Sequence, residues 1–176
     1  AVACYACVGY IVTIVYLLLQ GIGDGCQPMI SRYYGRGRRA DMKRTCWLAY
    51  ATAGALSLLS VCLLFLTRWR IGGLFGASPP VSLGVGETLP LFLAGVLFLA
   101  YTRITAAGFY ATDESLLSYI LVYAEPLLLL VFLLLLPAFL GLTGVWLAMP
   151  ASQMTTALIA AAVKRRADSP NACRVG

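Results

Sequence analysis

The chain has 176 residues, of which 61% are hydrophobic and 11% charged, with a formal net charge of +6 and a mean hydropathy of +0.86. This composition is too apolar for a domain with a water-exposed polar surface, and it indicates an integral membrane protein. The chain contains no histidine, which argues against a zinc site and excludes a histidine-dependent catalytic triad. We therefore expect a protein that is not an enzyme and that has no metal or other cofactor.

Five apolar segments each reach the roughly 20 residues that an α-helix needs to cross the hydrocarbon core of a bilayer. The segments between them contain the glycine, proline and charged residues that are typical of loops. No segment alternates apolar and polar residues as the strands of a membrane β-barrel do. We predict an all-α membrane helix bundle with five transmembrane helices, at approximately 2–30, 45–66, 87–110, 116–139 and 144–163.

The distribution of basic residues predicts how the bundle is oriented in the membrane. If the five spans alternate, ten Lys and Arg residues lie on one side and only Arg68 and Arg70 on the other. The ten are Arg32, Arg36, Arg38, Arg39, Lys43, Arg44, Lys164, Arg165, Arg166 and Arg174. Cytoplasmic loops carry the excess of basic residues. We therefore expect a cytoplasmic C-terminal tail (167–176) in the cell membrane, and no nucleic-acid partner.

The first apolar segment carries polar residues at helical spacing. On one face lie Thr13, Gln20, Asp24, Gln27 and Ser31. Lipid cannot hydrate a carboxylate, so Asp24 should face the protein interior or a water-filled pathway. It is a candidate pathway carboxylate, or a partner for a basic residue such as Arg103. Gln20 and Gln27 either line the same pathway or form hydrogen bonds between helices.

Small residues in the same segment predict a close contact with another helix. Gly21 and Gly25 form a G-x-x-x-G pair, a spacing that lets two membrane helices approach closely. Pro28 follows one turn later. We expect these three residues to pack against a neighbouring helix.

The fourth segment contains a second intramembrane acid, Glu125, followed directly by Pro126. A carboxyl group at this depth either binds and releases a proton or forms a salt bridge with Arg103 on the preceding span. Two residues earlier, Tyr123 offers a ring face on which an organic cation can bind. Glu125, Arg103 and Tyr123 therefore join the candidates for a substrate or ion pathway.

Other residues of the spans are expected to have structural roles. On the fifth segment, Ser152, Gln153 and Thr156 are predicted to pack between helices. Trp47, Trp69 and Trp146 lie near span ends, where tryptophan commonly marks the membrane interface.

Two stretches of the chain resemble one family of transporters. The first is Gly21-Ile-Gly-Asp-Gly-Cys-Gln-Pro-Met-Ile-Ser, followed by Tyr34-Gly35 and the basic loop; the second runs from Leu136 to Pro150. Both are similar to sequences of the multidrug and toxic compound extrusion (MATE) transporters, in the same order and at the same separation. The resemblance extends over nearly the whole chain except its last dozen residues.

The resemblance implies a protein of twelve helices in two lobes, in which residues 1–166 form helices eight to twelve of the C-terminal lobe. An N-terminal lobe of the same protein would then be a partner of this chain, besides the lipid bilayer. The implied function is export of amphipathic or cationic organic compounds, such as drugs, in exchange for protons or sodium ions. Glu125 departs from the family, in which many members have a basic residue near this point.

Two other functions remain open at this stage. The first alternative to export is a truncated or oligomerising membrane module that does not transport. The second is a lipid-linked sugar flippase of the same superfamily. The Gly-Gln-Pro stretch favours the drug exporter.

Overall fold

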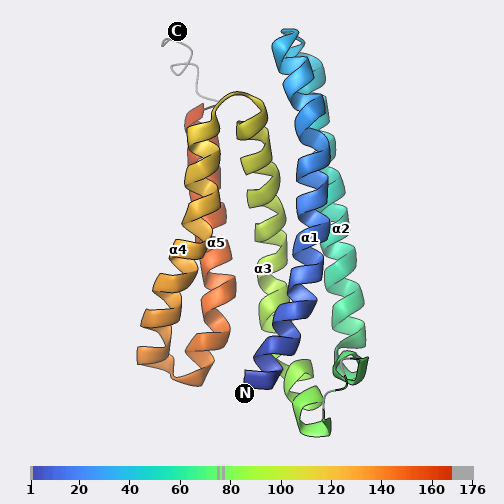
Figure 1. The fold of residues 1–176 in the computed structure, drawn as a ribbon, viewed down its shortest axis with the longest axis vertical. Helices are drawn as coiled ribbons and strands as arrows, with labels where there is room; N and C mark the ends of the chain where they lie inside the picture. Colours follow the sequence, from blue (N-terminus) through green and yellow to red (C-terminus); the bar gives the residue numbers. More distant parts are fainter. Residues whose placement is uncertain (1, 75, 77, 168–176) are drawn as a thin grey trace.

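The computed structural model describes residues 2–74, 76 and 78–167, and this part of the chain forms five α-helices and no strand (Figure 1). All five are long and apolar enough to cross a membrane. The predicted all-α membrane helix bundle is thus confirmed. The helices are α1 Val2–Gly35, α2 Arg39–Leu74, α3 Pro79–Ala111, α4 Ser115–Leu140 and α5 Leu142–Ala167.

The helices extend beyond the predicted spans because the polar residues at their ends continue the helical backbone. α1 has 34 residues and α2 has 36, which is about 50 Å of helix at 1.5 Å per residue. The hydrocarbon core is only about 30 Å thick. The α1–α2 hairpin therefore projects beyond the core, and Figure 1 shows it reaching past the α3–α4 connection.

Residues with positive φ follow the ends of α1 and α3. After α1, Gly37 has φ +68°, and the amides of Gly37 and Arg38 donate to the carbonyls of Tyr34 and Tyr33, each at 3.0 Å. This is the hydrogen-bond pattern of a Schellman cap, which favours glycine at the left-handed position. After α3, Asp113 has φ 66°, and the Glu114 amide donates to the Phe109 carbonyl at 3.0 Å. Both connections are therefore short, and they place consecutive helices side by side.

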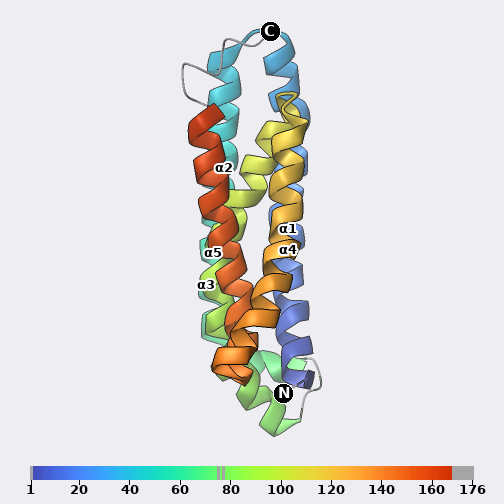
Figure 2. The same ribbon diagram turned by 90° about the vertical axis from the view of Figure 1, so that its left-hand side faces the viewer.

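Helix α3 is the centre of the bundle and contacts all four other helices. It lies between the α1–α2 pair and the α4–α5 pair in Figure 1, and Figure 2 shows α1 and α4 on the same side of the bundle. Half of the membrane-spanning window of α3 is buried, against 6% of that of α4. α4 consists almost wholly of large apolar residues, because most of its surface is left for lipid.

Trp146 was predicted to lie at the membrane interface, but it is buried in the core of the bundle. It is only 8% exposed, and its ring lies 5.7 Å from that of Phe92 and 5.6 Å from that of Tyr5. Three aromatic rings thus join α1, α3 and α5 in the core. Trp47 is 67% exposed, as an interfacial residue would be.

The two basic clusters lie at the same end of the bundle. The α1–α2 connection and the end of α5 are both at the top of Figure 1, and the α2–α3 and α4–α5 connections are at the bottom. Alternating spans require this arrangement. Arg174 and residues 168–176 of the predicted tail lie outside the described residues. That the basic end is cytoplasmic, and that the lobe comprises 1–166, remain predictions.

Candidate functional site

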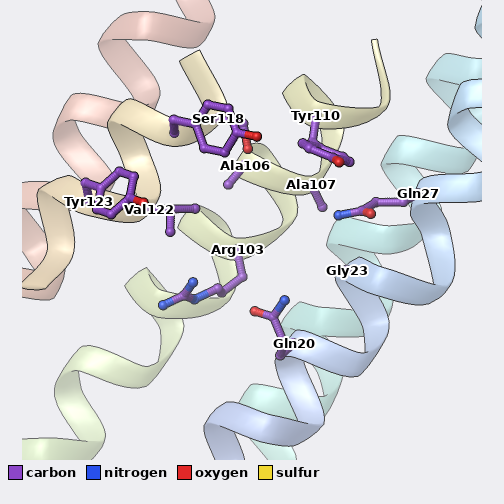
Figure 3. A pocket seen from close by; sticks show the side chains of 11 residues that line it. Gln20, Gly23, Gln27, Arg103, Ala106, Ala107, Tyr110, Ser118, Val122 and Tyr123 are labelled. Carbon is purple, nitrogen blue, oxygen red and sulfur yellow. The ribbon is translucent and has the colours of Figure 1, made fainter. Parts of the chain in front are cut away.

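A cavity of about 370 Å³ lies between α1, α3 and α4 (Figure 3). Gln20 and Gln27 approach it from α1, Arg103 lies near its centre on α3, and Tyr123 lies on the α4 side. Four of the six predicted pathway residues therefore line one cavity. The complete lining is Gln20, Gly23, Gln27, Arg103, Ala106, Ala107, Tyr110, Ser118, Tyr119, Val122 and Tyr123.

Helical periodicity explains how three helices supply this lining. On α3, Arg103, Ala106, Ala107 and Tyr110 follow one another at intervals of three, one and three residues, so they share one face. Gly23 supplies the space where α1 meets this face: a Cβ at Gly23 would lie 3.4 Å from the Cβ of Ala107. Gly23 and Ala107 thus let the backbones of α1 and α3 approach each other closely at the cavity wall.

Arg103 and Glu125 form an ion pair between α3 and α4. The Nη2 atom of Arg103 donates to Oε2 of Glu125 at 2.5 Å, and the two side chains are 12% and 17% exposed. The guanidinium carbon also lies 4.4 Å from the ring centroid of Tyr16 on α1. Of the two interpretations of Glu125, the salt bridge is the one that this structure contains. Arg103 connects all three helices that surround the cavity.

Asp24 has a different partner from the one predicted. Its Oδ1 atom accepts a hydrogen bond from the Gln20 amide at 2.9 Å, and it forms no ion pair with Arg103, whose carboxylate partner is Glu125. Asp24 is exposed and is not part of the cavity lining. Of the two alternatives for Asp24, the pair with Arg103 is therefore wrong, because Glu125 reaches the guanidinium from the helix on the opposite side of the cavity.

The predicted packing role of Gly21, Gly25 and Pro28 is not found within the described part of the chain. All three are exposed, and a Cβ built at Gly21 or Gly25 would meet nothing within 4 Å. The helix contact of α1 is made instead by Gly23, which points towards α3. Packing of Gly21, Gly25 and Pro28 against a helix outside the described residues stays a prediction.

A second polar cluster lies on the opposite side of α3, towards α2 and α5. Lys164 Nζ donates to the Tyr50 hydroxyl at 3.0 Å and lies 4.1 Å from the centroid of the Tyr50 ring. The Tyr50 hydroxyl is also 2.8 Å from Thr105 Oγ1, and its ring stacks on Tyr101 at 5.6 Å. This cluster was not predicted from the sequence. There, Lys164 was used only as one of the basic residues that orient the bundle in the membrane.

This cluster yields a test of the contacts that join α2, α3 and α5. We expect Tyr50→Phe to lower the free energy of unfolding by about 1–2 kcal/mol, because it removes the hydroxyl that Lys164 and Thr105 share. The ring and its cation–π contact would remain. Thermal unfolding of the purified protein measures the change, and Tyr10→Phe, on an exposed residue of α1, is the control. Equal stability of the two variants would show that the shared hydroxyl contributes nothing.

Three polar residues of α5 that were predicted to pack between helices are buried. Ser152, Gln153 and Thr156 are 1%, 3% and 1% exposed. A Cβ at Gly95 of α3 would overlap Oε1 of Gln153, so Gly95 provides the space for this side chain. None of the three lines the cavity between α1, α3 and α4.

Five apolar helices of membrane-spanning length, with a polar cavity between three of them, define a multi-pass membrane protein. The family model MatE matches residues 1–133. The chain therefore belongs to the MatE family of transporters, and the resemblance to MATE sequences is confirmed over this range, which ends before the second stretch at Leu136–Pro150. No curated protein and no solved structure shows significant similarity to the chain.

Proposed function

We propose that this chain takes part in export of amphipathic organic compounds, including organic cations, in exchange for protons or sodium ions. Membership of the MatE family supports transport. The observation that carries the proposal is the cavity between α1, α3 and α4, whose walls bear an arginine, two amides and four hydroxyl groups inside apolar spans. Such a lining is costly in lipid and is typical of a transport pathway.

In this proposal, Asp24 is the carboxylate that binds the coupling ion. Glu125 is already paired with Arg103, so a cation would have to compete with a fixed positive charge for it. Asp24 has only the neutral Gln20 amide as partner in the described structure. Its carboxylate is therefore able to take up a proton, a sodium ion or the ammonium group of an organic cation. Binding of an ion there would couple its movement to that of the substrate.

The exposed face of α1 is also where the N-terminal lobe would pack. Gly21 and Gly25 lie on this face beside Asp24, with no side chain of the described residues near them. A carboxylate facing lipid would be unfavourable, so a protein surface is the expected neighbour. We propose that an N-terminal lobe covers it. In an oligomerising module a second copy would do so, and crosslinking through Gly21→Cys distinguishes the two by the mass of the product.

Asp24→Asn tests the assigned coupling role. We expect this variant to lose most ion-driven efflux of a cationic dye from cells or proteoliposomes, because the amide keeps the shape but cannot bind the ion. Coupling between linked sites is typically about 5- to 150-fold. Asp41→Asn is the matched control, since Asp41 lies in the first turn of α2, where it pairs with Arg38. Unchanged efflux in Asp24→Asn would overturn the proposal that Asp24 binds the coupling ion.

A further inference from the structure

The cavity between α1, α3 and α4 has an unusual balance of charge. Among the described residues that line it, Arg103 is the one charged side chain, and none is a carboxylate. Glu125 approaches Arg103 from outside the lining, and Asp24 is held by Gln20 outside it. An organic cation that entered the cavity would meet a guanidinium before it met an acid.

The same cavity has hydrogen-bond donors without acceptors. A guanidinium has five N–H donors, and that of Arg103 makes one hydrogen bond among the described residues, to Glu125. Its Nε atom is buried without a partner. The Ser118 side chain, which is 5% exposed, and the Gln27 amide form no side-chain hydrogen bond with the rest of the described chain. Unpaired donors in an apolar setting are unfavourable, so a ligand that supplies acceptors would be stabilised.

The shape of the cavity favours a flat apolar body beside these donors. Gly23 has no side chain, Ala106 and Ala107 each have only a methyl group, and Figure 3 shows the two alanines directed into the cavity. Tyr119 and Tyr123 on α4 are 51% and 64% exposed, so their ring faces are accessible. A volume of about 370 Å³ is at the lower end of the range for small-molecule sites. It suits a compound of one or two rings.

We propose that this cavity binds planar aromatic acids. The carboxylate of the ligand accepts hydrogen bonds from Arg103, and Ser118 and Gln27 are further donors elsewhere in the lining. The ring lies between the small residues of α1 and α3 and the tyrosines of α4. A charged acceptor strengthens such hydrogen bonds, and guanidinium geometry matches a carboxylate. This inference rests on the proposed function only in taking the cavity as the substrate site.

A matched series of naphthalene ligands tests the proposal by direct binding. The purified full chain is titrated with 2-naphthoate, 2-naphthamide and 2-naphthylmethylammonium, which differ in charge and not in ring size. We expect naphthoate to bind about 10- to 100-fold more tightly than the amide, as charge-assisted hydrogen bonds would give. The ammonium compound should bind most weakly. Equal binding of acid and amide, or preference for the ammonium compound, would overturn the proposal.

A double variant assigns the preference to Arg103. Arg103→Met combined with Glu125→Gln removes both charges of the ion pair, and we expect it to abolish the preference for naphthoate over naphthamide. Retained naphthamide binding shows that the cavity is intact. Arg70→Met removes one positive charge at the end of the bundle remote from the cavity and should leave the preference unchanged. Should the double variant fail to fold, Ser118→Ala, with an expected smaller loss of naphthoate affinity, takes its place.

The outcomes separate this inference from the proposed function. Tight naphthoate binding without ion-driven efflux of any compound would support the acid site and overturn the export proposal. Ion-driven efflux of cationic dyes with no preference for naphthoate would support export and overturn the acid site.

Discussion

Replacing Arg103 with methionine is expected to lower the free energy of unfolding by about 3–5 kcal/mol, the cost of leaving one charge of a buried pair uncompensated. The Glu125 carboxylate is 17% exposed, and Arg103 is its ion-pair partner. The substitution also removes the cation that lies over the Tyr16 ring. Contacts with α1 and α4 would therefore weaken together. Denaturant unfolding of the purified protein, followed by circular dichroism, measures the loss.

The double variant Arg103→Met/Glu125→Gln is the decisive comparison for this prediction. With both charges removed, most of the stability should return, because paired replacement of buried ions is often neutral. Arg70→Met serves as a surface control, since Arg70 is exposed in the C-terminal part of α2. A single Arg103→Met variant as stable as the native protein would mean that Glu125 is neutral or hydrated without its partner.

The second large effect concerns the α4–α5 hairpin. A Cβ at Gly144 would overlap the Leu136 carbonyl group and lie 2.7 Å from the Pro137 nitrogen. These are backbone atoms near the end of α4, so no side-chain rotation relieves the overlap. We expect Gly144→Ala to lower the free energy of unfolding by about 1–3 kcal/mol, a typical cost of overpacking. Thermal unfolding provides the measurement.

Gly54→Ala is the matched control, because Gly54 is also helical and a Cβ there would meet nothing within 4 Å. It should be neutral or more stable by about 0.5–1 kcal/mol, since alanine restricts the unfolded chain more than glycine does. Equal effects of the two substitutions would show that α4 and α5 are separated further at Gly144 than the structure has them.

The sequence predicted most of the residues at the candidate site, but it did not predict which acid pairs with Arg103. Gln20, Gln27, Arg103 and Tyr123 line one cavity, as polar residues at helical spacing in apolar spans suggested. Asp24 was expected to pair with Arg103, yet the partner of Arg103 is Glu125 on α4. The sequence contains both possible acids. Which of them reaches the guanidinium depends on how α1 and α4 lie beside α3.

By itself, the sequence determined the class of protein and the number of helices, because both follow from local properties. An apolar run of about 20 residues must form a helix in lipid, whatever surrounds it. The family also followed from local motifs, with Gly21–Ser31 as the main signature. The position of loops followed from glycine, proline and charge.

Tertiary structure alone decided which face of each helix meets protein and which meets lipid. Membrane helices whose surfaces are mostly apolar do not show the one-sided pattern by which a water-soluble helix reveals its buried face. The central place of α3, the contact at Gly23 in place of Gly21 and Gly25, and the insertion of Lys164 beside Tyr50 were therefore not predictable. They arise from close packing between specific small, aromatic and charged residues on different helices, which no single segment encodes.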